Sequence, residues 1–141
     1  MPDTTKLSLA DIAKKMRNLD IATLTTVTEG GGLASRPMSN NGDVAFDGNS
    51  YYFTFEASRT VADIEKNPQV NLAFEDGDGL YLTVAGTAEL IRDKAKFEEH
   101  WVPDLDRWFE QGEDTPGVVL LKVKAQRIKY WQGEESGEYV A

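Results

Sequence analysis

The sequence contains no cysteine and only one histidine, His100. The absence of cysteine excludes disulfide bonds, thiolate catalysis and cysteine-ligated metals or clusters. A single histidine argues against a histidine-rich metal site and against hydrolysis by a Ser-His-Asp triad. We interpret His100, which stands between Glu99 and Trp101, as a surface or packing residue.

Long hydrophobic runs are also missing. The longest stretch without a charged residue is the ten residues from Gly79 to Ala88, whereas a helix that crosses a bilayer needs about 20 apolar residues. The first residues, which include Asp3 and Lys6, form no apolar signal core. We therefore expect a cytoplasmic protein with no membrane contact.

Positive charge is scarce. The chain has 24 acidic residues against 15 Lys and Arg, for a net charge of −9, which argues against nucleic acid or anionic lipid as a partner. Its 141 residues, 40% of them hydrophobic, are expected to form a single folded domain over residues 1–141. Residues 134–141, which contain three glutamates, are expected to form an acidic tail.

The sequence is rich in short segments in which apolar and polar residues alternate, as is typical of strands. Strands are predicted over residues 20–28, 33–41, 50–56, 69–75, 80–91 and 117–131. Helical periodicity predicts short helices over residues 8–19, 59–67, 94–101 and 104–110. Strands at hairpin spacing with short peripheral helices predict a mainly β (α+β) fold, a closed or partly open antiparallel barrel.

Two local features refine this prediction. The Asp-Gly-Asp-Gly sequence at residues 76–79 leads directly into a strand and lacks the bidentate glutamate of a calcium loop, so a hairpin turn is predicted there. Gly86, inside a long strand, is expected to mark a bend or a bulge.

A candidate anion site lies where the strand over residues 50–56 runs into the next helix. Ser58 is a natural N-cap, and the backbone N–H groups and dipole of a helix start stabilise an anion. Arg59 adds a charged fork at the same corner. The alternative is that Ser58 only caps the helix and that Arg59 is a solvated residue of its first turn.

Two further segments stand out. Pro37 cannot donate to a strand ladder, so its strand is expected to be an edge or to carry a bulge, with Arg36 either beside that opening or simply exposed. Near the end of the chain, a strand carries Trp131 and Gln132 up to the acidic residues. Taken alone, Trp131 is more typical of a core or an interface than of a ligand contact.

In their order and spacing, residues 35–38, 52–59, 65–70 and 130–133 resemble the FMN-binding split-barrel superfamily of pyridoxamine 5'-phosphate oxidase. The resemblance is closest to its general stress protein branch, and it covers nearly the whole chain from the first helix to Trp131. It implies a six-stranded antiparallel split β-barrel, and a homodimer that holds FMN in a groove between its subunits.

The resemblance also implies which residues bind the cofactor, position by position. The phosphate would be held by Arg36, Ser58 and Arg59, next to Thr60. The flavin ring and ribityl chain would lie against Pro37, Met38, Phe53 and Thr54. Trp131 and Gln132 would come from the partner subunit to cover the flavin.

The chain departs from the oxidase pattern in two places. The oxidase carries a basic residue where Thr60 stands, and it carries arginine and histidine beyond the terminal tryptophan, where this chain has glutamates. Oxidation of pyridoxine or pyridoxamine phosphate is therefore disfavoured. The insertion with Trp101, Trp108 and Phe109 either shapes the mouth of the pocket or packs over one end of the barrel.

The functional prediction is an FMN-binding general stress protein. It is either a flavin-dependent oxidoreductase or a non-catalytic module that stores or senses flavin or vitamin phosphate. A deazaflavin F420-binding reductase and a cofactor-free interaction domain are further alternatives, whereas the single histidine disfavours histidine-ligated haem. The sequence names no substrate, electron donor or catalytic residue.

Overall fold

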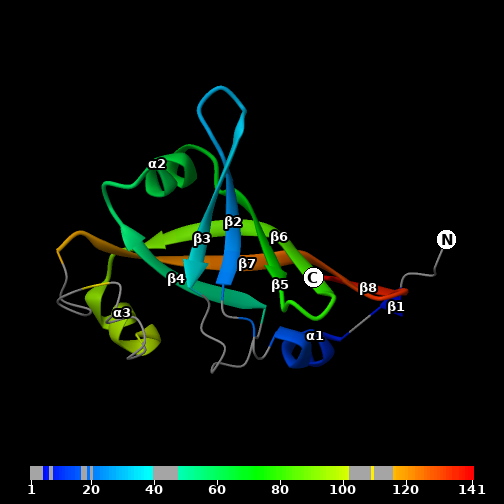
Figure 1. Ribbon diagram of the computed structural model, residues 1–141. Helices are drawn as coiled ribbons and strands as arrows, with labels where there is room; N and C mark the ends of the chain where they lie inside the picture. The colour runs from blue at the N-terminus through cyan, green and yellow to red at the C-terminus, as the bar shows by residue number, and fades with distance from the viewer. Residues whose placement is uncertain are drawn as a thin grey trace.

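The structure, a computed structural model, is built on one mostly antiparallel sheet with three short helices around it (Figure 1). It describes residues 5–6, 8–16, 19, 21–39, 48–101, 109 and 116–141. The strands are β1 (Thr5–Lys6), β2 (Ile21–Val27), β3 (Leu33–Ser39), β4 (Asn49–Phe55), β5 (Gln69–Glu75), β6 (Leu80–Ile91), β7 (Val118–Gln132) and β8 (Glu135–Val140). The helices are α1 (Leu9–Met16), α2 (Arg59–Lys66) and α3 (Lys94–His100).

The strand order is β1-β8-β7-β6-β5-β2-β3, and β4 pairs with β7 off this path. Every ladder is antiparallel except the short one between β1 and β8. Within the described ranges no ladder joins β3 to β4, so the sheet is not closed. The predicted antiparallel split-barrel fold is confirmed; its six strands correspond to β2–β7, and β1 and β8 extend the sheet to eight.

The long strand β7 changes its neighbour halfway along. Residues 118–124 pair with β4, whereas residues 127–132 pair with β8. The change coincides with a register shift between β6 and β7, beside Gly86, which confirms the predicted irregularity. A Cβ at Gly86 would lie 2.1 Å from the backbone oxygen of Lys124, so the two strands approach this closely only because the residue is glycine.

Two hydrophobic clusters lie on opposite faces of β4. The main core contains Tyr52 and the inward-facing residues of β2, β5, β6 and β7, and the second cluster contains Phe53 and Phe97 of α3. The alternation of Tyr51, Phe53 and Phe55 in the sequence predicts one buried face for this strand, the face that carries these three side chains. This prediction is wrong, because α3 covers that face while the main core covers the other.

The turns and helix starts follow their sequence signals. Gly30 and Gly31 adopt φ of 89° and 88° in the turn between β2 and β3, a conformation open to glycine. Ser8 and Asp11 exchange hydrogen bonds at the start of α1, as in a capping box. The predicted helix over residues 104–110 lies outside the described residues apart from Phe109, and no helix in the described part is long and apolar enough to span a bilayer.

Residues 134–141, expected to be an acidic tail, instead contain strand β8. It pairs with β7 on one side and with β1 on the other. Tyr139 packs against the main core and Gly137 is buried, so the segment has an inner face despite its acidic composition.

Candidate functional site

The predicted corner at the start of α2 is present as a capped helix N-terminus. Ser58 is the N-cap, with φ −73° and ψ 154°, and its Oγ accepts a hydrogen bond of 3.4 Å from the backbone N–H of Val61. The hydroxyl of Thr54, at the end of β4, lies 3.5 Å from the same oxygen. The first turn of a helix leaves backbone N–H groups without an intrahelical acceptor, and the helix dipole adds positive potential there. This end of α2 therefore favours an anion.

A groove of about 590 Å³ opens beside α2. Its lining residues come from the turn after β2, from the residues just before α2 and from α2 itself: Thr28, Glu29, Ala57, Ser58, Arg59, Ala62, Asp63 and Lys66. Lys66 pairs with Glu29 at 3.5 Å, and both side chains are largely exposed. Arg59 makes no ion pair with any residue that the structure describes. Its charge is therefore available to a ligand in the groove.

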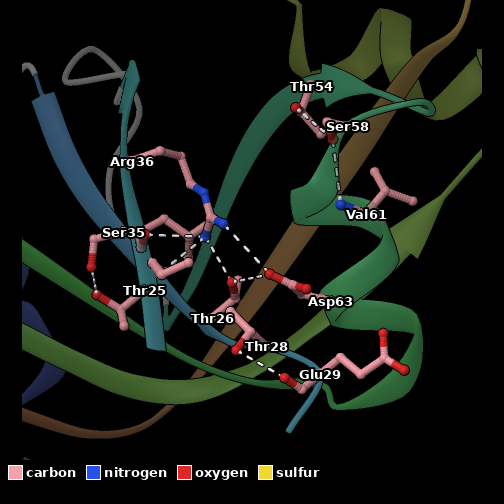
Figure 2. Close-up of polar contacts among 12 residues, drawn as sticks. Thr25, Thr26, Thr28, Glu29, Ser35, Arg36, Thr54, Ser58, Val61 and Asp63 are labelled. Carbon is pink, nitrogen blue, oxygen red and sulfur yellow. Dashed lines mark hydrogen bonds and ion pairs between the residues drawn. The ribbon is translucent and has the colours of Figure 1, made fainter. Parts of the chain in front are cut away.

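Arg36 reaches from β3 toward α2 (Figure 2). Its Nη1 donates to the Thr26 hydroxyl at 2.8 Å and to the backbone oxygens of Ala34 and Leu24 at 3.2 and 3.4 Å. Its Nη2 lies 3.6 Å from Oδ2 of Asp63. The Arg36 side chain is 21% exposed, so it is an anchored, partly buried arginine.

The hydroxyl of Thr26 connects Arg36 with Asp63. Thr26 is fully buried and donates its proton to Oδ2 of Asp63 at 2.8 Å. Because a hydroxyl has one proton, its oxygen remains free to accept from Arg36. The three side chains therefore form one continuous network that joins β2, β3 and α2.

The two residues after Arg36 lie on opposite faces of β3. Pro37 is exposed and pairs with Thr23 of β2 on the edge strand of the sheet, as its missing N–H predicts. Met38 is buried in the main core. Within one chain, the outer face at Pro37 is the part of this segment open to a ligand.

Phe53 and Thr54, predicted at the flavin ring and ribityl chain, and Thr60, predicted next to the phosphate, also lie apart. Phe53 packs edge-on against Phe97 and Trp101, with ring centroids 5.8 and 4.7 Å apart, in the second cluster. Thr60 is buried in α2 and is not among the residues that line the groove. Of this predicted set, Thr54 lies at the groove end, beside Ser58.

The aromatic insertion packs over the second cluster. Trp101 lies against Phe109, with ring centroids 5.4 Å apart, and Phe109 is buried. His100 stacks on Tyr51, with centroids 3.6 Å apart and an interplanar angle of 14°. These contacts agree with packing roles for Trp101, Phe109 and His100, while Trp108 lies outside the described residues.

Trp131 and Gln132 lie on another part of the sheet. Trp131 is 43% exposed and stands directly opposite Tyr81 of β6. The side-chain oxygen of Gln132 accepts a hydrogen bond of 3.2 Å from Lys15 of α1. Neither residue lines the groove of its own chain.

Sequence reasoning missed Thr26 and Asp63. Thr26 continues the inner-face alternation of Ala22 and Leu24 along β2, and Asp63 falls on the buried side of α2. Buried polar groups need polar partners. The sequence did carry a signal: Thr26 and Asp63 are polar residues at positions where the strand and helix patterns predict apolar ones.

Solved structures share this fold. A protein related to general stress protein 26 from Clostridium acetobutylicum matches with a TM-score of 0.80 and 21% identity, covering 94% of this chain and 93% of that one. A general stress FMN/FAD binding protein from Xanthomonas citri matches with a TM-score of 0.73 and 23% identity, covering 90% and 89%. A heme binding protein from Mycobacterium smegmatis matches with a TM-score of 0.75 and 15% identity, covering 97% and 60%.

Sequence comparison agrees with this likeness. General stress protein 26 of Bacillus subtilis (strain 168) is 28% identical over 120 residues, which are 82% of this chain and 81% of that protein. The family described as pyridoxamine 5'-phosphate oxidase like matches residues 8–141. The chain thus belongs to the pyridoxamine 5'-phosphate oxidase-like family.

Proposed function

We propose that this chain binds FMN and that the groove beside α2 receives the FMN phosphate. The observation that carries the proposal is the pairing of the α2 N-terminus with Arg59, a cation that forms no ion pair within the described ranges. A phosphate group is recognised by such helix N–H groups together with an arginine fork. The FMN/FAD-binding neighbour from Xanthomonas citri supports the choice of flavin.

Arg36 does not line this groove, but its guanidinium contacts Asp63, which does. Its Nη1 is held from β2 and β3, and its Nη2 faces Asp63, a residue that lines the groove. Holding the guanidinium in place before the ligand arrives lowers the entropic cost of using it. In this proposal, Arg59 contributes a charge that is not paired with another described residue, and Arg36 contributes a guanidinium that is already held in place before the ligand binds.

FMN fits this groove better than histidine-ligated haem does. The only histidine of the chain, His100, stacks on Tyr51 beside α3 and does not line the groove. Mass spectrometry of the small molecule that copurifies with the protein separates FMN from FAD, F420 and haem. Haem or F420 in place of FMN would contradict the proposal.

The phosphate site is tested by comparing FMN with riboflavin, which lacks the phosphate. Wild-type protein should bind FMN more tightly, and Arg59→Ala should weaken FMN binding roughly tenfold while leaving riboflavin binding unchanged. Lys96→Ala is the matched control, because it removes one exposed positive charge from α3. Equal affinity of the wild-type protein for the two flavins, measured by calorimetry, would refute the site.

Arg59 is a better probe than Arg36. Arg36→Ala would leave Asp63 buried without its counter-ion, and such a loss lowers stability by about 3–5 kcal/mol. A fall in FMN affinity in that variant could therefore come either from a lost phosphate contact or from a less stable fold. Arg59 is exposed, and no described carboxylate pairs with it.

The proposal extends to a homodimer that takes Trp131 of one subunit to the flavin of the other. It is supported by the exposed position of Trp131, away from the groove of its own chain. A bound FMN would supply hydride-transfer chemistry, and the chain would supply its binding and orientation. Reduction of the loaded protein by NADH or NADPH, followed by turnover of an acceptor, would assign oxidoreductase activity; no turnover would favour flavin storage.

A further inference from the structure

Asp63 is a buried carboxylate that lines the proposed phosphate groove. Its side chain is 8% exposed and lies 3.6 Å from Nη2 of Arg36. A carboxylate and a phosphate need the same partners, namely cations and hydrogen-bond donors. Arg36 does not itself line the groove, but its guanidinium contacts Asp63, which does, so a phosphate bound next to Asp63 would compete with that carboxylate for Arg36.

The two carboxylates of the groove, Glu29 and Asp63, differ in how strongly they interact with their cationic partners. Glu29 and its partner Lys66 are 86% and 65% exposed, so solvent and salt screen that pair. The side chains of Arg36 and Asp63, whose contact is drawn in Figure 2, are only 21% and 8% exposed, so their interaction is screened much less. Asp63 is thus the carboxylate that most effectively neutralises positive charge at the groove.

On this basis we infer that Asp63 is a specificity-determining residue that competes with the phosphate for Arg36 and so weakens the binding of phosphate-bearing ligands. The inference rests on the phosphate site proposed above. In the ligand-free protein, Asp63 compensates the charge of Arg36. Without the Asp63 charge, Arg36 is a half-buried cation with no counter-ion, and a phosphate then restores neutrality.

Asp63→Asn tests this inference, because it removes the charge while keeping the size of the side chain and an oxygen that accepts from Thr26. The variant should bind FMN roughly three- to tenfold more tightly than wild type at low salt, with riboflavin binding unchanged. Its ligand-free melting temperature should fall, and FMN or inorganic phosphate should raise it by more than in wild type.

Glu29→Gln is the matched control, since it removes the same charge from the same groove at an exposed position. Its FMN affinity should change less than twofold, as expected of a screened charge. An equal gain in both variants would overturn the inference in favour of a general charge effect. Weaker FMN binding by Asp63→Asn would also overturn it, because Asp63 would then act by orienting Arg36.

A measurement on the wild-type protein covers the case in which Asp63→Asn does not fold. The carboxyl 13C signal of Asp63 should shift when FMN binds and should stay in place when riboflavin binds. An unchanged signal with FMN would overturn the inference. The two proposals fail differently. Wild-type protein that does not prefer FMN over riboflavin would refute the phosphate site itself. Wild-type protein that prefers FMN but shows no change at Asp63 would refute only the role of Asp63.

Discussion

At the scale of single residues, Gly86 shows how the backbone limits what the sequence can accept. A Cβ there would stand 2.1 Å from the backbone oxygen of Lys124, and neither strand can move without breaking the ladder at the bulge. We predict that Gly86→Ala lowers the free energy of unfolding by about 3 kcal/mol. Urea denaturation of the ligand-free protein measures this loss.

Gly32→Ala is the control for that prediction. It makes the same change to the unfolded chain, but its Cβ would meet only the Thr28 hydroxyl, a movable side chain, at 3.0 Å. Its stability should stay within about 1 kcal/mol of wild type. Similar losses in the two variants would mean that the unfolded state, and not the close approach at Gly86, sets the cost.

Some residues of the candidate site could be predicted from their neighbours in the sequence, and others could not. Ser58 could be predicted as an N-cap because it depends only on the residues that follow it. The environment of Arg36 could not, since its partners Thr26 and Asp63 come from β2 and α2 and meet it only in the folded protein. Both partners are polar residues at buried positions, which marks them as partnered but does not say with whom.

At the scale of secondary-structure elements, Arg92 connects α2 to the ends of two strands through hydrogen bonds. Its Nε and Nη2 donate to the two carboxylate oxygens of Glu56 at 2.5 and 2.8 Å, and Nη2 also donates to Glu65 of α2 at 2.7 Å. The bidentate bond with Arg92 lowers the pKa of Glu56 below its ordinary value of 4.5. The residues just after β4 and β6 are thereby joined to the helix that forms the groove.

This network predicts a pH dependence. Because the pKa of Glu56 is lower in the folded protein than in the unfolded chain, the stabilisation is present above pH 4.5 and is lost as the pH falls through the folded value. Glu56→Gln should therefore have a lower melting temperature than wild type at pH 7, and the difference should shrink toward pH 3. Thermal unfolding at both pH values measures the effect.

Glu99→Gln serves as the control, because Glu99 forms an exposed i,i+3 pair with Lys96 within α3. Such a pair contributes little, so this variant should follow wild type at both pH values. A Glu56→Gln difference that stays constant from pH 7 to pH 3 would show that the carboxylate charge of Glu56 is not the source of the stabilisation.

Elements were predictable where their pattern is local. The alternation in β2, β5 and β6 and the Asn67-Pro68 end of α2 gave bounds close to those observed. The two buried faces of β4 were not predictable, because only tertiary packing brings α3 over Phe53. The strand β8 could not be predicted, because its residues 135–140 show no alternation of apolar and polar residues, and only pairing with β7 and β1 makes them a strand.

At the scale of the whole molecule, the large exposed apolar side chains lie on the outer face of the sheet. By strand alternation, all six in the described part of the chain lie on the face opposite the main core: Ile21, Leu33, Tyr81, Trp131 and Val140, and Phe55 beside the second cluster. Trp131 and Tyr81 are cross-strand neighbours on this face, and adjoining exposed aromatic side chains of this kind mark a contact surface. It is the surface through which we expect two copies of the chain to associate.

The dimer prediction is tested by placing a charge on that face. Trp131→Glu should convert a wild-type dimer into a monomer in light scattering, because burying an unpaired carboxylate opposes association. Phe55→Glu is the control, since Phe55 is also 43% exposed but packs against Phe109 and pairs with Val118, at the other end of β7 from Trp131. A wild-type monomer, or equal dissociation in both variants, would contradict the assignment of this face.

The same variant tells whether the dimer completes the flavin site. If Trp131 of one subunit covers the flavin bound at the groove of the other, Trp131→Glu weakens FMN and riboflavin by the same factor, because the ring contact is lost while Ser58 and Arg59 still bind the phosphate. Arg59→Ala weakens FMN alone. Dilution of wild-type protein below its dimer dissociation constant should likewise lower its affinity for both flavins. Affinities that stay constant on dilution would place the whole flavin site within one chain and leave the apolar face a separate role.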